Sequence, residues 1–255
     1  LPIWSSSPGL PWTQYGYKTK GDIRKDPEAI RRIRLFWHRI KTGHNLQLPD
    51  CCAFVRSHIC KHGESKVRAV WGFPATVTFA EAMFAIPLIR SYQASKTPLA
   101  YGYETGIGGM KKIFREFSGK YYLGIDFSKF DKSIPAWLIE AAFDILAYNI
   151  DFIQYQDHGV PVSSALLRVW DVLVKYCIKT KIRMCNGERY MKTSGLASGS
   201  YFTQLIGSIC NHILLIYAAL KSNATINNLL VFGDDSIMST DDLFTPDHVQ
   251  RVLAP

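Results

Sequence analysis

The sequence predicts an α+β fold, on three observations. Several stretches repeat apolar residues at helical spacing, whereas two short runs, 120–127 and 229–238, are rich in the apolar and β-branched residues of strands. These patterns follow no regular strand–helix–strand order. With 255 residues and 47% hydrophobic content, the chain can bury the core of one large domain or of two or three subdomains.

The first predicted helix begins at Asp26, because an N-cap aspartate is followed there by Pro27 and the dipole-favoured Glu28. Its apolar stripe consists of Ile30, Ile33, Trp37 and Ile40. Segment 18–41 carries nine Lys and Arg residues against three acids. Two interpretations of this basic face stay open, a solvated surface and a contact with polyphosphate.

The middle of the chain alternates helices and strands. KVRAVWGFPATVTFAEAMFAIPLI is basic at first and then apolar at helical spacing, and KYYLGIDF (120–127) predicts a buried strand. Pro135 marks a helix to about Ile150. Segment 163–183 is predicted to be helical and then extended. The residues expected to point inward from the helix after Pro135 are Trp137, Leu138, Ala141, Ile145 and Tyr148.

The last third contains a charge-free run, 193–220, which Ser, Gly, Thr, Gln, Asn and His interrupt. We therefore expect a buried helix and no membrane span. LLVF and SIM then form a hairpin around a Gly-Asp turn, and a further helix begins at Thr245 or Pro246. Because the chain lacks an initial methionine and stops soon after this helix begins, we expect it to be a piece of a longer protein.

The net charge of +9 and the pI near 9.2 favour a polyanionic partner, such as nucleic acid or an anionic membrane face, over an ordinary basic soluble protein. The six cysteines include no CxxC pair, and the first residues given lack the charged, apolar and small-residue pattern of a secretory signal, so a reducing compartment is expected. One cluster has ligand types suited to zinc, but its spacing fits no usual finger: Cys51, Cys52, His58, Cys60 and His62.

Acidic residues gather at two places. Asp234 and Asp235 are adjacent at the hairpin tip, where their repulsion in a partly desolvated setting calls for a cation. Asp126 ends the 120–127 strand, and Asp131 follows it. If this strand lies beside the hairpin, Asp126 and Asp234 converge. A ligand set made only of oxygen suits Mg²⁺ rather than zinc.

Between these places lies SGLASGSYFTQLIGSICN. Its Ser-Gly repeat permits a flexible, closely approached loop. The helix after it has a small polar stripe of Thr203, Gly207 and Asn211, which faces either a cavity or a neighbouring helix. Its opposite face is apolar, with Phe202, Leu205, Ile206, Ile209 and Ile213.

The ordered set SSSPGLP, KVRAVWG, GIDFSKFD, SGSYFT with Asn211, and FGDD resembles viral RNA-dependent RNA polymerases, and most of all those of the partitivirus group of double-stranded RNA viruses. The resemblance implies a right-hand fold with an antiparallel palm sheet flanked by helices and with the thumb largely absent. Its implied parts are fingers (1–115), palm with the first acidic motif (116–150), a fingers insertion (151–190), and palm with the Ser-Gly loop, helix and hairpin (191–255).

The same resemblance implies roles for particular residues. Asp126 and Asp234, with Asp235 as an auxiliary acid, would be the catalytic ligands of two Mg²⁺ ions, for which Mn²⁺ can substitute. Asp131 would recognise the ribose 2′-OH of the incoming nucleotide, helped by Asn211 and Thr203. The further implied nucleotide contacts are Lys66, Arg68 and Ser198, and the implied template contacts are Ser7, Gly9, Pro11 and Gly199.

The implied activity is template-directed transfer of nucleotides from NTPs to an RNA 3′-OH. Its partners would be RNA template, RNA product, NTPs and a viral capsid protein, inside the virion or in the host cytoplasm. Two alternatives stay open. A reverse transcriptase shares the acidic geometry, although Asp131 and Asn211 suit a 2′-OH, and a non-catalytic RNA-binding core protein would use the basic surface alone.

Overall fold

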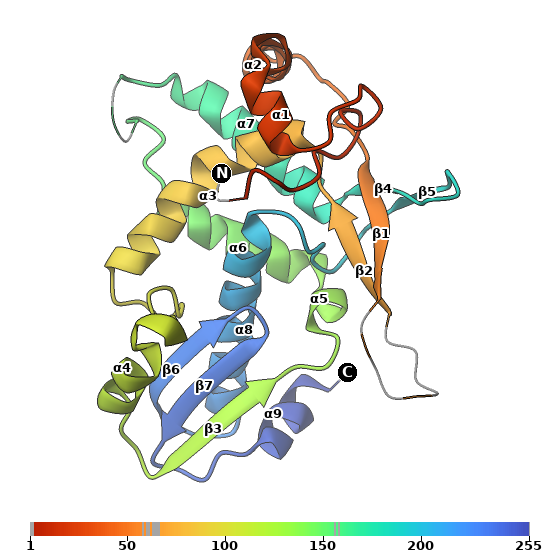
Figure 1. The fold of residues 1–255 in the computed structure, drawn as a ribbon. Coiled ribbons are helices and arrows are strands. Elements are labelled where there is room, and N and C mark those ends of the chain that lie inside the picture. The colour runs from red at the N-terminus through yellow and green to blue at the C-terminus, as the bar shows by residue number, and fades with distance from the viewer. Residues whose placement is uncertain are drawn as a thin grey trace.

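The computed structural model describes residues 3–57, 59, 62, 67–155, 157 and 159–254. Helices and strands are mixed, as the sequence predicts (Figure 1). The helices are α1 Lys20–Lys25, α2 Pro27–Lys41, α3 Ala75–Ala94, η1 Thr105–Ile107, α4 Gly109–Glu116, α5 Phe130–Ser133, α6 Ala136–Tyr148, α7 Ser163–Ile178, α8 Phe202–Lys221 and α9 Pro246–Leu253. The strands are β1 Cys51–Ser57, β2 Val67–Gly72, β3 Tyr121–Asp126, β4 Lys181–Arg183, β5 Arg189–Met191, β6 Ile226–Phe232 and β7 Asp235–Thr240.

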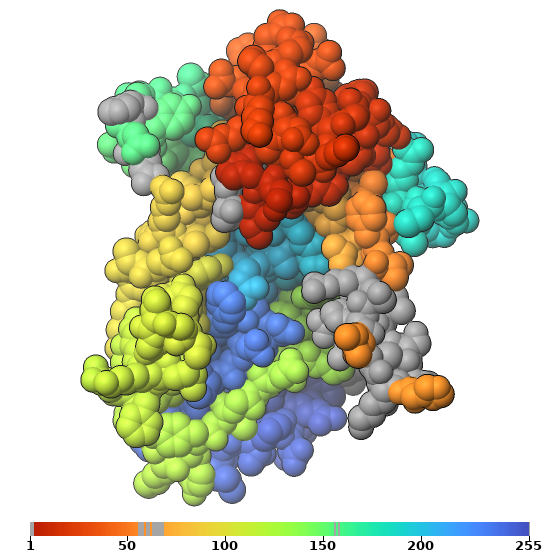
Figure 2. Space-filling view, in the orientation of Figure 1, coloured from red at the N-terminus to blue at the C-terminus, as the bar shows by residue number. Residues whose placement is uncertain are grey.

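Two separate sheets organise the chain. One has the strand order β2-β1-β4-β5, and the other has the order β3-β7-β6 and is antiparallel throughout. Figure 1 shows the three-stranded sheet in front of α8, with the long β1 and β2 strands at a distance from it. The N-terminal segment covers the end of the molecule farthest from this sheet, as the space-filling view shows (Figure 2).

Helix α8 joins two hydrophobic cores. Its first half packs with α2, α3, α6 and α7 in the larger core, whereas Leu215 and Ala218 in its second half pack with the sheet residues Val231 and Met238 and with Val249 of α9. By length and composition α8 could span a membrane, yet 56% of its apolar window is buried inside the protein. The prediction of a buried helix is thus confirmed.

Several local predictions are confirmed because they rest on local signals. Asp26 caps α2 through bonds from the N–H groups of Glu28 and Ala29, and Ile33, Trp37 and Ile40 are buried. The predicted hairpin is β6 and β7. Segment 163–183 forms α7 and then β4, and α9 begins at Pro246 after the cap residue Thr245.

Two predictions about burial are wrong. Strand β3 is an edge strand of a three-stranded sheet, so Tyr121 and Tyr122 are exposed rather than buried. Of the five residues predicted to point inward from α6, Leu138 is buried as predicted, whereas Trp137 is 64% exposed and Tyr148 is 92% exposed. Ile145 is also exposed and Ala141 is only half-buried. The face that is buried consists of Leu138, Ile139, Ala142, Phe143 and Leu146. Helix α6 itself has apolar residues on several of its sides, so its sequence does not determine which side packs against the core.

Candidate active site

The acidic residues meet at one end of the three-stranded sheet. Asp126, the last residue of β3, is paired with Asp235, the first residue of β7, and Asp234 lies in the turn before β7. Directly opposed residues of antiparallel strands project to the same face of a sheet. The predicted strand does lie beside the hairpin, and the register makes Asp235 the direct partner of Asp126. All three aspartates are exposed.

These carboxylates repel one another. The pKa of Asp235 is raised by partial desolvation of its exposed carboxylate and by the negative charges of Asp234 and Asp126. Partial desolvation and the charge of Asp234 likewise raise the pKa of Asp131, the acid predicted to contact ribose. In the described parts of the chain, no Lys, Arg or His forms an ion pair with any of the four. A bound cation would relieve this repulsion.

The donor set fits a hard divalent cation such as Mg²⁺, because it consists of carboxylate oxygens with excess negative charge. Among the residues that the structure describes, no three His, Cys, Asp or Glu side chains are placed to coordinate a metal ion together. Coordination at this site would therefore need oxygens beyond those of the aspartates, as Mg²⁺ sites usually have from water and phosphate. For zinc, His58 and Cys60 lie outside the described residues, and Cys51 is buried in β1.

Helix α8 holds the turn that carries Asp234. The Ser208 hydroxyl accepts a hydrogen bond from the Gly233 N–H (2.8 Å) and donates to the Gln204 carbonyl (2.7 Å). The Asn211 amide nitrogen donates to the carbonyls of Gly233 (3.0 Å), Asp234 (3.0 Å) and Asp235 (3.4 Å). Gly233 has φ +70°, and a Cβ there would lie 2.8 Å from the Gln204 side chain. The position of Asp234 is thus set by α8.

This arrangement places the predicted nucleotide contact Asn211 beneath the turn. Its side chain is fully buried, and its Oδ1 has no hydrogen-bond partner among the described residues. Thr203, the other predicted helper, donates its hydroxyl to the Ala197 carbonyl (2.9 Å). Ser208 and Gln204 were not among the predicted site residues, because Ser208 follows the recognised polar stripe by one position.

The loop before α8 is tied to the segment that carries Asp131. The Asp131 carbonyl accepts a hydrogen bond from the Leu196 N–H (2.6 Å), and the Ile134 carbonyl accepts one from the Gly195 N–H (2.8 Å). Gly195 has φ +72°, and a Cβ there would lie 2.5 Å from the Asp131 carbonyl oxygen. These contacts hold the Ser-Gly loop against the segment that carries Asp131.

The same loop lies against β2 on its other side. A Cβ on Gly199, which has φ +124°, would lie 2.3 Å from the Trp71 carbonyl oxygen. The predicted template contact Gly9 approaches the next residues in the same way, since a Cβ there would lie 2.9 Å from the Phe73 carbonyl oxygen. The Ala75 N–H also donates to the Pro8 carbonyl (2.7 Å). Three predicted motifs therefore meet along residues 71–75.

The structure describes the surroundings of the other predicted contact residues in less detail. Ser7 accepts a long hydrogen bond from the Gly9 N–H (3.4 Å), and the Pro11 carbonyl accepts one from the Gln14 N–H (2.9 Å). Ser198 forms an isolated bridge with Ser200. Lys66 lies outside the described residues. The backbone of Arg68 belongs to β2, but its side chain is not among those described.

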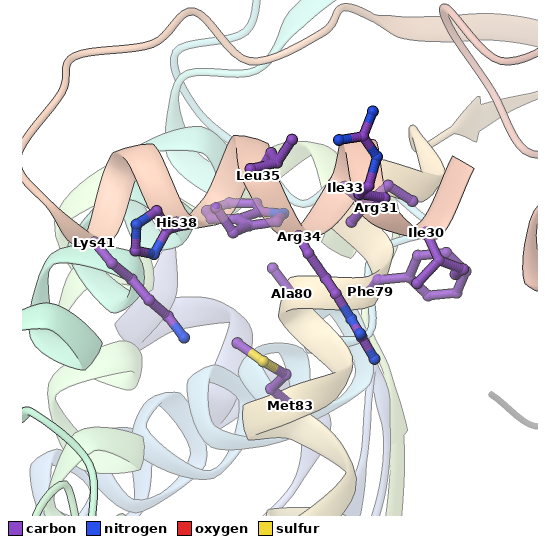
Figure 3. A pocket seen from close by; sticks show the side chains of 11 residues that line it. Ile30, Arg31, Ile33, Arg34, Leu35, His38, Lys41, Phe79, Ala80 and Met83 are labelled. Atoms are coloured by element: carbon purple, nitrogen blue, oxygen red, sulfur yellow. The ribbon is translucent and has the colours of Figure 1, made fainter. Parts of the chain in front are cut away.

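A cavity of about 580 Å³ lies apart from the acids, between α2 and α3 (Figure 3). Arg34 and Lys41 extend from α2 toward α3 on either side of Met83. These cations belong to the basic face for which the sequence left two interpretations open. Arg31 at the same cavity is paired with Glu28 (2.7 Å). No predicted catalytic, nucleotide or template residue lines this cavity.

Comparison with known proteins assigns this arrangement to a family. The model of the family described as viral RNA-dependent RNA polymerase matches residues 3–254. The RNA-directed RNA polymerase of Cryptosporidium parvum virus 1 is 29% identical, over 92% of this chain and 43% of its own length. That of white clover cryptic virus 1 is 28% identical, over 73% of this chain and 33% of its own. The chain thus spans less than half the length of these relatives.

The fold has a counterpart among solved structures. The crystal structure of the RNA-dependent RNA polymerase of a human picorbirnavirus matches with a TM-score of 0.63 at 23% identity. The match covers 80% of this chain and 38% of that one.

Proposed function

Because the chain belongs to the viral RNA-dependent RNA polymerase family, we propose that it carries the nucleotidyl-transfer centre of an RNA-directed RNA polymerase. The single observation that carries this proposal is the meeting of Asp126, Asp234 and Asp235 at one end of the β3-β7-β6 sheet. A protein that only bound RNA would gain nothing from acids gathered beside a polyanionic ligand. The partitivirus-like relatives agree with the resemblance found in the sequence.

In this proposal Asp126 and Asp234 hold two divalent cations, with Asp235 as an auxiliary acid. When bound, such cations lower the pKa of the attacking RNA 3′-OH and neutralise the leaving pyrophosphate. The aspartates would determine where the positive charge of the cations lies. The hydrogen bonds of Ser208 and Asn211 to the turn keep Asp234 in place relative to Asp126. Preorganised electrostatics of this kind supply most of the catalysis in phosphoryl transfer.

The remaining residues would position the substrates. Asp131 would accept a hydrogen bond from the ribose 2′-OH of the incoming nucleotide, which a deoxyribose cannot donate. Thr203 and Asn211 would support that contact. Lys66 and Arg68 would bind the triphosphate, and Ser198 the nucleotide. The residues proposed to guide the template are Ser7, Gly9, Pro11 and Gly199.

The natural partners in this proposal are RNA template, RNA product and NTPs, and a viral capsid protein for an enzyme that works inside the particle. We place the proposed activity in the virion interior or in the host cytoplasm. The subdomain assignment also belongs to this proposal, with fingers at 1–115 and 151–190 and palm at 116–150 and 191–255.

Primer extension on an RNA template with Mg²⁺, using the natural protein, tests the proposal. We expect NTP incorporation that Asp234→Asn abolishes, whereas Asp144→Asn, at an exposed position of α6, leaves it intact. Substantial synthesis by a folded Asp234→Asn variant would contradict the assignment. Preference for dNTPs would favour a reverse transcriptase. RNA binding that depends steeply on salt, with no synthesis by the wild type, would favour a non-catalytic core protein.

A further inference from the structure

A buried glutamate lies outside the acidic site and has no part in the proposed chemistry. Glu81, in the middle of α3, is 1% exposed. Its Oε1 accepts a hydrogen bond from the Ser200 hydroxyl (2.7 Å), and its Oε2 accepts one from the Tyr201 N–H (3.1 Å). Both partners belong to the Ser-Gly loop where it enters α8. The carboxylate thus joins α3 to this loop.

Glu81 supplies the acceptor for the Tyr201 N–H at the start of α8. Tyr201, the residue before the helix, makes no side-chain capping bond. The first N–H groups of a helix need acceptors from elsewhere, and a negative charge there also interacts favourably with the helix dipole. Ser200 extends the arrangement, because its hydroxyl also accepts a hydrogen bond from the Phe202 N–H (3.0 Å).

Holding a carboxylate here has an energetic cost. Burial raises the pKa of Glu81 to about 7, while its two hydrogen bonds and the nearby Lys20 oppose that rise. Lys20 also donates to the Ser6 hydroxyl (3.2 Å), next to the proposed template-entry residues. An apolar side chain would avoid this cost within the apolar run FAEAMFAIPLI of α3, so the carboxylate is better explained by its two bonds.

We propose that Glu81 is a positioning residue that fixes the Ser-Gly loop and the start of α8 relative to the acidic site. This inference rests on the proposed polymerase function. Helix α8 transmits the constraint, because Ser208 and Asn211, further along it, hold the turn of Asp234. On the opposite side, Gly199 already lies against the Trp71 carbonyl. Glu81 therefore acts on nucleotide and metal binding through the loop, without contacting either.

Three variants separate this role from plain stability. Glu81→Ala removes both acceptors. Glu81→Gln keeps the shape, since its amide oxygen can accept from the Tyr201 N–H and its amide nitrogen can donate to the Ser200 hydroxyl. Ser200→Ala removes one bond and leaves the carboxylate in place. Glu140→Ala, at an exposed position of α6, is the matched control.

The measurements, on the natural protein, are kcat and KM for NTP, the thermal midpoint, and hydrogen exchange of the Tyr201 and Phe202 amides. At temperatures below the thermal midpoint of the variant, where it is folded, we expect Glu81→Ala to lower kcat/KM by about tenfold or more. Small misplacements of positioning groups are costly in catalysis. Ser200→Ala should lose less. Glu81→Gln should recover most of the wild-type value. Exchange at Tyr201 should be faster in Glu81→Ala and near wild type in Glu81→Gln.

Wild-type kcat/KM in folded Glu81→Ala and Ser200→Ala would overturn the proposal, even with a lowered midpoint, because Glu81 would then be structural only. Equal losses in Glu81→Gln and Glu81→Ala would overturn it as well. If Glu81→Ala does not fold, the kcat/KM values of Ser200→Ala and Glu81→Gln decide between a positioning role and a purely structural role for Glu81. If the wild type makes no RNA, the proposed function fails, and amide exchange alone tests the anchoring: unchanged exchange at Tyr201 in Ser200→Ala and Glu81→Ala would overturn it.

Discussion

Asp126 and Asp235 are directly opposed across the antiparallel strands β3 and β7, although they are far apart in the chain. Both side chains project to the same face of the sheet, and the charge of Asp126 contributes to the raised pKa of Asp235. The sheet register alone thus creates a concentration of negative charge next to the turn of Asp234.

Replacing Asp126 with Asn should weaken cation binding and abolish RNA synthesis. The substitution removes one proposed ligand and one of the charges that repel Asp235, so the variant should be no less stable than the wild type without Mg²⁺. Thermal unfolding with EDTA and with Mg²⁺ measures this. The wild type should gain stability from Mg²⁺ by mass action, and Asp126→Asn should gain much less. Equal gains in both proteins, with Asp144→Asn as the control, would argue against a cation at Asp126.

Replacing Asp131 with Ala should weaken discrimination against dNTPs. The carboxylate is proposed to accept a hydrogen bond from the 2′-OH, and an active site that pairs a substrate hydroxyl discriminates strongly against analogues lacking it. The ratio of kcat/KM for NTP and dNTP measures the effect, and it should fall mainly through poorer use of NTP. Unchanged selectivity would refute the sugar contact.

Replacing Asn211 with Ala should destabilise the fold as well as the activity. The variant loses the donor to three successive carbonyls of the acidic turn, and leaving buried acceptors unpaired costs about 1–3 kcal/mol. Urea unfolding measures the change. Asn227→Ala, at an exposed position of β6, should leave the free energy of unfolding nearly unchanged. An Asn211→Ala protein with wild-type stability would mean that the turn holds itself.

Glu81 should give the protein a distinctive pH dependence. Burial raises its pKa from the ordinary 4.5 to about 7, so the folded state binds this proton more tightly than the unfolded state. Its contribution to stability is therefore largest below about pH 4.5 and falls by up to about 3 kcal/mol as pH rises to about 7 and slightly beyond. The titratable groups that influence Glu81 or are influenced by it are Lys20, Cys51, Tyr176, Cys177 and Tyr201.

Among these groups, burial raises the pKa of the thiols and phenols, so they stay neutral at pH 7. Burial lowers the pKa of Lys20, while its attraction to Glu81 opposes that fall and also opposes the rise of the Glu81 pKa. Urea unfolding of wild type and Glu81→Gln at pH 5 and pH 8 isolates the Glu81 contribution, because the other acids titrate in both proteins. The wild type should lose more stability than Glu81→Gln on going to pH 8. Parallel changes in the two proteins would show that Glu81 does not titrate as proposed.

The local elements could be predicted from the sequence because their causes are local. Asp26 and Pro27 start α2, Thr245 and Pro246 start α9, and the glycine of LLVFGDDSIM allows the tight turn between β6 and β7. The order of the motifs was enough to suggest the family, and the charge was enough to suggest a polyanionic partner. These signals are carried by neighbouring residues, so no knowledge of distant contacts is needed.

Only the tertiary structure decided which faces are buried and which residues support the acids. Helix α6 has apolar residues on several sides, and β3 became an edge strand because β7 pairs with it on one side only. The bonds from Ser208, Asn211 and Glu81 join segments far apart in the chain. The lone acid of α3 in an apolar run was the one signal for Glu81. Such contacts depend on how separate elements pack together, and that packing is not encoded in any single stretch of the sequence.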